Sequence, residues 1–115
     1  MGIQNLSTNV LLITLPEQPQ YEDELEKVNK GLSDEFNCNV VVDFYKVQIL
    51  TSGTISNLVT LNRLLKDSGQ LLVLCNVPSN IERIFTRLGL KRVFEFAKDE
   101  LAALQYIRSE SHLLI

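Results

Sequence analysis

The chain has 115 residues, and 45% of them are hydrophobic, which is enough to bury one core and form one domain. Its formal net charge of -3 and its pI of about 5.1 argue against a basic surface that binds nucleic-acid phosphates. No apolar run is long enough to cross a membrane, and the opening residues lack the basic and then apolar pattern of a secretion signal. We therefore expect a cytoplasmic protein without a membrane segment.

The first half of the chain alternates between strand-like and helix-like patterns. Residues 10–15 (VLLITL) are an apolar run that stops at Pro16, which predicts a buried strand that pairs as a hairpin with residues 3–7. Apolar residues then recur at helical spacing among acids over residues 21–32, which predicts an amphipathic helix. Residues 40–44 (VVVDF) predict a central strand with both faces covered, and such strands have parallel neighbours.

The middle of the chain predicts a strand, a helix and a second strand in succession. Apolar residues lie on one stripe over residues 54–66, and Gly69 is expected as the left-handed residue that ends this helix. Residues 71–75 (LLVLC) predict the next buried strand. The three elements form a βαβ unit, whose strands are parallel and whose crossover is expected to be right-handed.

The last third of the chain contains two shorter helices around a short strand. Ser79 and Glu82 have the spacing of a capping box, which predicts a helix over residues 79–88. Residues 93–96 (VFEF) predict a strand, and Asp99 is expected to cap a final helix. That final helix carries the apolar residues Leu101, Leu104 and Ile107.

Together these elements predict an α/β fold in one domain over residues 1–108, followed by a tail over residues 109–115. We expect a mixed β-sheet of about five strands with a mostly parallel centre, flanked by about four helices. The tail ends in three apolar residues. The sequence leaves open whether this end docks on the domain, binds a partner, pairs two copies into a homodimer or frays.

Few residues are arranged for catalysis. Cys38 and Cys75 lie far apart without a second ligand near either, so we expect two buried, reduced thiols, although the sequence leaves a disulfide between them open. The single histidine, His112, lies outside any nucleophile or metal motif. Asp43 stands where α/β sheets bind ligands, but we expect nearby backbone amides to satisfy it. We therefore expect no metal, no cofactor and no enzymatic activity.

Residues 49–56 (ILTSGTIS) place two adjacent hydroxyls and a glycine at the start of the middle helix. Thr51 or Ser52 can cap the helix by accepting a hydrogen bond from an amide two or three residues later, which accounts for one hydroxyl only. Gly53 predicts a close backbone approach or a turn without a crowding side chain. Because a helix N-terminus stabilises anions, a phosphate on Thr51 or Ser52 is expected to leave the helix folded.

The order of these motifs resembles a known family. From about Asn39 to Leu104 the chain resembles a STAS domain, the module of bacterial anti-sigma-factor antagonists. The segments that carry the resemblance are, in order, VVVDF, a short connector, TSG, a helix, SGQLLVLCNV and PSNIERIFTRLGLKRVFEF. The resemblance implies a non-enzymatic partner-switching role in the regulation of transcription. In such proteins the unphosphorylated antagonist binds an anti-sigma factor that is also a serine/threonine kinase, and this releases the sigma factor. Phosphorylation of the first hydroxyl of the turn breaks the complex.

Carried over by position, the resemblance makes Thr51 the phosphoacceptor, with Ser52 as the second choice. The expected partner-binding residues are small or polar: Thr51, Ser52, Gly53, Thr54, Ser56 and Asn57. The chain departs from the family at Leu50, where an Asp is usual. This departure favours an alternative, a STAS scaffold or sensory module that is not phosphorylated, and a second alternative is a small-ligand or nucleotide-binding module at the same helix N-terminus.

Overall fold

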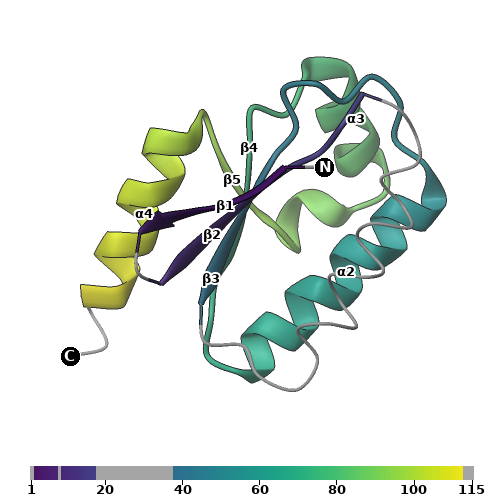
Figure 1. The fold of residues 1–115 in the computed structure, drawn as a ribbon. Coiled ribbons are helices and arrows are strands. Elements are labelled where there is room, and N and C mark those ends of the chain that lie inside the picture. The colour runs from purple at the N-terminus through teal and green to yellow at the C-terminus, as the bar shows by residue number, and fades with distance from the viewer. Residues whose placement is uncertain (1, 8, 18–37, 113–115) are drawn as a thin grey trace.

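The computed structural model describes residues 2–7, 9–17 and 38–112 (Figure 1). Its strands are β1 (Gly2–Ser7), β2 (Val10–Thr14), β3 (Asn39–Asp43), β4 (Leu72–Cys75) and β5 (Glu95–Ala97). Its helices are α2 (Ser52–Asp67), α3 (Ser79–Arg87), the 3-10 turn η1 (Leu90–Arg92) and α4 (Glu100–His112). The helix expected over residues 21–32 and the apolar end of the tail lie outside the described residues.

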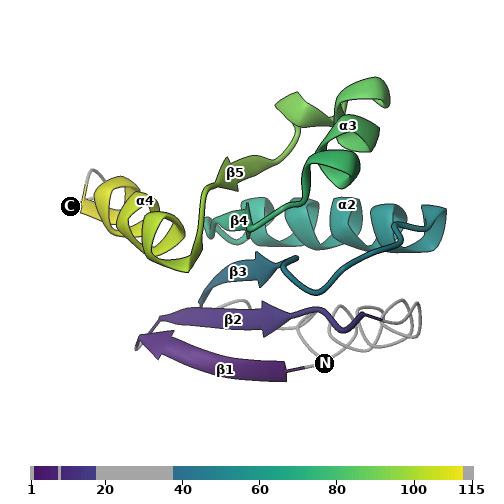
Figure 2. The same cartoon turned by 90° about the horizontal axis from the view of Figure 1, so that it is seen from above.

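The five strands form one sheet in the order β1-β2-β3-β4-β5. The first two strands pair antiparallel, which confirms the predicted hairpin, and every later pair is parallel. The α/β fold with a mixed, mostly parallel sheet is therefore confirmed. In Figures 1 and 2 the sheet separates α4 from α2 and α3, so helices lie on both faces.

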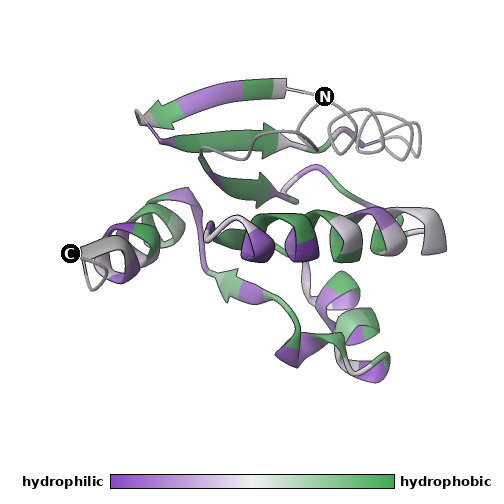
Figure 3. Cartoon of the chain, turned by 90° about the horizontal axis from the view of Figure 1, so that it is seen from below, coloured by the Kyte–Doolittle hydropathy of each residue, from purple (hydrophilic) through white to green (hydrophobic). Residues whose placement is uncertain are grey.

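The two central strands are buried on both faces. Every residue of β3 and β4 is buried, and Figure 3 shows the apolar colouring of β2 and β3 beside a β1 that is polar in its middle. Side chains such as Val40, Val42 and Leu74 pack against the apolar stripe of α2 and against α3. Alternate side chains such as Val41 and Val73 pack against α4. The uniform apolar character of these strands thus requires a helix layer on each side.

An aromatic cluster joins α3 to the sheet and to the segment before β5. The ring of Phe85 is fully buried and makes edge-to-face contacts with three others. Its centroid lies 6.2 Å from that of Phe44, 5.7 Å from that of Phe94 and 5.5 Å from that of Phe96. These geometries are the ones that aromatic quadrupoles prefer. Phe85 therefore joins α3 to Phe44, which follows β3, and to the segment that contains Phe94 and Phe96.

Two predicted helix ends are confirmed. Gly69 has φ 75°, and the amide of Gln70 donates to the carbonyl of Leu65 at 2.8 Å while that of Gly69 donates to Lys66 at 3.0 Å. This is the double hydrogen bond that closes a helix through a left-handed residue. At α4, the amide of Ala102 donates to Asp99 Oδ1 at 2.8 Å, as expected of an N-cap.

Other boundaries differ from the sequence-based expectations. The N-cap of α3 is Pro78 and no side chain caps the helix, so the predicted capping box is wrong: Ser79 already lies inside the first turn. Glu82 instead pairs with Lys91. The strand expected over residues 93–96 begins only at Glu95, because the preceding residues follow η1 and bury an aromatic ring.

Two further expectations need correction. Cys38 is half-buried rather than buried, whereas Cys75 is buried, and both thiols are free. Helix α4 continues to His112, so residues 109–112 are helical rather than part of a tail.

Over the described ranges, no helix is long and apolar enough to span a bilayer.

We predict that Phe85→Ala lowers the free energy of unfolding by about 3–5 kcal/mol, because it removes a fully buried ring and leaves a cavity among three others. Leu88→Ala, one turn further along and 56% exposed, is the matched control and should change it by less than about 0.5 kcal/mol. Urea denaturation with unchanged slopes measures both. Equal losses in the two variants would contradict the role assigned to the aromatic cluster.

Candidate functional site

The N-terminus of α2 is built by Thr51. Its backbone is extended, with φ -102° and ψ 161°, and its Oγ1 accepts a hydrogen bond from the amide of Thr54 at 3.2 Å. The carbonyl of Thr51 accepts the next amide, that of Ile55, at 3.1 Å. The structure thus assigns the cap to the first of the two hydroxyls, which the sequence left open between Thr51 and Ser52.

The predicted partner-binding residues divide by exposure. Ser52 and Ser56 are exposed, while Thr51, Gly53 and Asn57 are half-buried. Thr54 is fully buried, so its place on a partner-facing surface was wrong. Its hydroxyl lies 3.0 Å from that of Thr51 and supports the cap from inside. Helical periodicity turns Thr54 inward, toward the stripe that continues at Leu58.

The connection from β3 to α2 presents apolar side chains that sequence reasoning missed. Phe44 and Val47 are buried and Leu50 packs on the core, which fixes the path of the connection. Tyr45 and Ile49 point outward instead and are 57% and 55% exposed. The sequence contained a signal for these exposed side chains, because the connection has more apolar residues than can all face the core. The connection that leads from β3 to the turn therefore carries exposed apolar side chains.

Below this turn, Asp43 is buried at the carboxyl end of β3. Its Oδ1 accepts hydrogen bonds from the amide of Tyr45 at 2.9 Å and from Asn76 Nδ2 at 3.1 Å. One partner is a backbone amide, as expected. A second acidic side chain, that of Glu100 in the first turn of α4, lies beside Asp43 and was not expected from the sequence. Strand β3 and helix α4 are distant in sequence, so only the fold brings the two carboxyls together.

The surroundings of Glu100 favour its protonated form. The hydrogen bond between the two side chains, then burial, then repulsion from Asp43 and Asp99 raise the pKa of Glu100 from 4.5 to about 7. Burial, and then the charges of Asp43, Glu100 and Asp99, raise the pKa of the Cys75 thiol to about 12. The thiol is therefore protonated at neutral pH and is a poor nucleophile. The described residues contain no group of three side chains suited to a metal ion.

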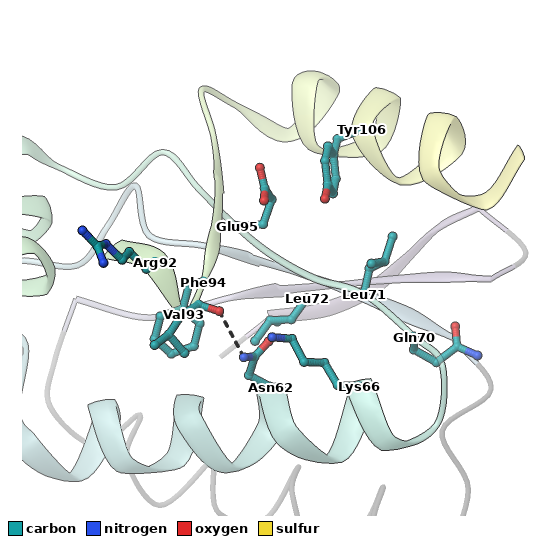
Figure 4. Close-up of a pocket in the computed structure, with 10 residues that line it drawn as sticks. All are labelled: Asn62, Lys66, Gln70, Leu71, Leu72, Arg92, Val93, Phe94, Glu95 and Tyr106. Carbon is teal, nitrogen blue, oxygen red and sulfur yellow. Dashed lines mark hydrogen bonds between the residues drawn. The ribbon is translucent and has the colours of Figure 1, made fainter. Parts of the chain in front are cut away.

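A separate cavity of about 230 Å³ lies between the C-terminal half of α2, the β5 segment and α4 (Figure 4). Buried Asn62 donates from Nδ2 to the carbonyl of Val93 at 3.3 Å on one wall. Its other polar lining residues are Lys66, Gln70, Arg92, Glu95 and Tyr106. The lining is of mixed charge and defines no ligand class. It also lies at the other end of α2 from Thr51, where the sequence placed the alternative small-ligand site.

We predict that Thr51→Ala destabilises the fold by about 1 kcal/mol but leaves it folded, because one capping hydrogen bond is lost. Thr51→Ser keeps the capping oxygen and should retain most of the stability. Thermal and urea unfolding of both variants would measure this. If the alanine variant matched the serine variant, the hydroxyl would not be the cap.

The raised pKa of Glu100 predicts a pH dependence of stability. The folded state binds this proton more tightly than the unfolded state, so the stabilisation is present below pH 4.5 and is lost as the pH rises to about 7. Glu100→Gln, which carries no titrating proton, should flatten the unfolding free energy over this window. Asp67→Asn removes an exposed charge elsewhere and serves as the control. Identical pH profiles for the wild type and Glu100→Gln would refute the coupling.

A family model described as STAS domain matches residues 19–103. No curated protein matches the chain in sequence. RsbS of Moorella thermoacetica, solved as a variant, has a TM-score of 0.81 at 16% identity, with 96% of this chain and 97% of that chain covered.

Two further solved structures have the same architecture. An anti-sigma-factor antagonist domain protein of Planctomyces limnophilus has a TM-score of 0.78 at 17% identity, covering 92% of this chain and 97% of that chain. The Bacillus cell fate determinant SpoIIAA in its phosphorylated form has a TM-score of 0.71 at 13% identity, covering 91% and 97%. These identities establish a shared fold. Since the family model also covers most of the sequence, from residue 19 to residue 103, the chain belongs to the STAS domain family.

Proposed function

We propose that this STAS domain is a non-enzymatic bacterial signalling protein, an antagonist that binds an anti-sigma factor with serine/threonine kinase activity through the N-terminus of α2. The observation that carries the proposal is the exposure of Ser52 directly beside the capping residue Thr51. A hydroxyl that caps nothing and faces solvent is available to another protein. One structural relative, SpoIIAA, has been solved in a phosphorylated form, which supports a site of this kind.

The electrostatics of α2 suit an acidic or phosphorylated group. Its first turn holds no acidic side chain, whereas α3 has Glu82 and α4 has Glu100 in that position. The partial positive charge of the helix N-terminus is therefore not neutralised from within α2. A phosphate on the turn, or a carboxylate of the partner, would gain from the same field.

Two exposed apolar residues of the β3–α2 connection are expected to add binding energy to this surface. Tyr45 and Ile49 are more than half exposed and come from the same connection as Thr51. Large side chains of this kind are common energetic centres of protein interfaces when a partner buries them. Ser52 and Ser56 are small, so they let a partner approach closely and cost little entropy to immobilise. We therefore assign the partner surface to the β3–α2 connection together with the exposed side of the first turns of α2.

Phosphorylation of this turn is the proposed switch. Thr51 is the acceptor by position, and Ser52 is the more exposed hydroxyl. A phosphate adds a charge of about -1.5 to -2 at pH 7, which costs desolvation and repels an acidic partner surface. A loss of about 1.4 kcal/mol already weakens binding tenfold.

Leu50 supports a second candidate function. This residue replaces the usual acid of the family and packs partly buried against the core, so it offers no carboxylate to orient a hydroxyl or a kinase. A STAS scaffold that binds its partner permanently, without being phosphorylated, is consistent with that substitution. The two functions share one surface and differ only in whether a phosphate is added.

We predict that Thr51→Glu and Ser52→Glu weaken partner binding at least tenfold, because each adds a negative charge to the contact surface. Ser52→Ala should bind nearly as well as the wild type. The measurement is capture of the partner from native extract on each immobilised variant, followed by titration of the purified partner. Gln105→Glu adds the same charge at an exposed position on α4 and serves as the control.

The captured partner also separates the two candidate functions. Incubation of the wild-type protein with that partner and ATP, followed by mass spectrometry, tests for a phosphate on Thr51 or Ser52. A phosphate there supports the switch, and binding without phosphate transfer supports the scaffold. Equal binding by Thr51→Glu, Ser52→Glu and the control would show that the partner binds elsewhere.

A further inference from the structure

The two edges of the sheet differ in how they are protected. Strand β1 lies at one edge and β5 at the other, and within the described residues each pairs with a single neighbour (Figure 2). An edge strand presents a row of unpaired backbone groups that can pair with another chain. Soluble proteins normally shield such edges with short strands, charges, prolines or bulges.

The β5 edge has this protection. The strand is three residues long, starts with the exposed acid Glu95 and is followed at once by the exposed base Lys98. The turn η1 precedes it with two further bases, Lys91 and Arg92. Charges at both ends of so short a strand oppose the addition of another strand.

The β1 edge lacks such protection. The strand has six residues, GIQNLS, with neither a charged side chain nor a proline, and the first charged side chain of the sequence is Glu17. Residues 2–5 are all exposed. The irregularity in pairing with β2 falls only between Asn5 and Ser7, which leaves the first part of the strand regular.

The absence of charge makes β1 compatible with pairing to a second copy of itself. In a two-fold pairing of identical antiparallel strands, residues at the axis meet their own copies, so any charged side chain there would face a like charge. A strand that pairs with itself must therefore be uncharged near its centre, and β1 is. Partner strands of a different protein impose no such condition.

Side-chain chemistry near the centre of β1 fits this symmetry. Ile3 lies opposite Ile13, which belongs to the core on the α2 side, yet Ile3 itself is 51% exposed. If the axis passes at Ile3, the two Ile3 side chains lie directly opposite each other and the two Gln4 side chains are diagonal neighbours. If it passes at Gln4, the two arrangements are exchanged. The pair of Ile3 side chains buries apolar surface, and the pair of Gln4 amides can exchange hydrogen bonds.

We propose that a second copy of this chain docks on the β1 edge by antiparallel β1–β1 pairing about a two-fold axis near Ile3 and Gln4, which extends the sheet across two protomers. The contact is small, so the dimer is expected to be weak, with a dissociation constant on the order of 10–100 µM. The Thr51 turn is not part of this surface, and the proposal does not rest on the proposed function.

A pair of opposite charges tests the pairing directly. Gln4→Lys and Gln4→Glu are each expected to weaken self-association at least tenfold, because like charges then face each other across the axis. An equimolar mixture of the two variants should recover a dimer at least as stable as that of the wild type. Gln105→Lys, which adds the same charge as Gln4→Lys on the exposed side of α4, should dimerise like the wild type.

Sedimentation equilibrium of the full chain from about 10 µM to about 1 mM covers the expected range. Hydrogen exchange at the two ends of this range should show slower exchange of β1 amides at the higher concentration and no change in β5. Circular dichroism checks that each variant folds. A wild type that stays monomeric throughout, a dimer that survives both Gln4 variants, or a mixture no stronger than either variant alone would each overturn the proposal.

Discussion

Burial of β3 and β4 on both faces is the constraint on which the rest of the structure depends. Parallel strands that are apolar on each side need helices on each side, and the chain can return to start a parallel neighbour only through a crossover. The crossover helix α2 therefore begins beyond the carboxyl end of β3. This is the edge of an open α/β sheet where ligands and partners are usually bound. The position of the Thr51 turn thus follows from the hydrophobic pattern of two strands.

One buried carboxylate joins the segments that meet at the carboxyl ends of these strands. Asp43 accepts from Tyr45 at the start of the β3–α2 connection and from Asn76 after β4, and it contacts Glu100 on α4. The β3–α2 connection, the segment after β4 and helix α4 thus meet at a single side chain. Its geometry positions the connection that carries the exposed residues of the partner surface. Nothing in this arrangement activates a nucleophile, since the nearby Cys75 thiol keeps its proton.

Local patterns in the sequence predicted most of the elements, because strands and helices here follow their hydrophobic period. The hairpin, the central strands, Gly69 and the Asp99 cap were all predicted correctly. Predictions failed where a tertiary contact decides. Strand β5 starts later than predicted because Phe94 packs against Phe85, and that contact has no local signal in the sequence.

The candidate site shows the same limit. Adjacent hydroxyls before a helix predicted an N-cap and left the second hydroxyl unexplained, since capping is a local interaction that needs one of them. The sequence alone could not say which of the two caps, nor that Thr54 is buried behind them. The Asp43–Glu100 pair lay beyond prediction because it joins residues that are distant in the sequence.

The hydroxyls of Thr51 and Ser52 have different surroundings, so a phosphate would have different effects on the two residues. Thr51 Oγ1 already contacts the amide and the hydroxyl of Thr54, so a phosphate on Thr51 must replace the cap with its own oxygens. The amide of Thr54 can donate to those oxygens, while the buried hydroxyl beside it limits how the larger group fits. Ser52 has no such duty in the cap, and its side chain faces solvent. Phosphorylation at Thr51 would thus change the helix end as well as the surface, whereas phosphorylation at Ser52 would change the surface alone.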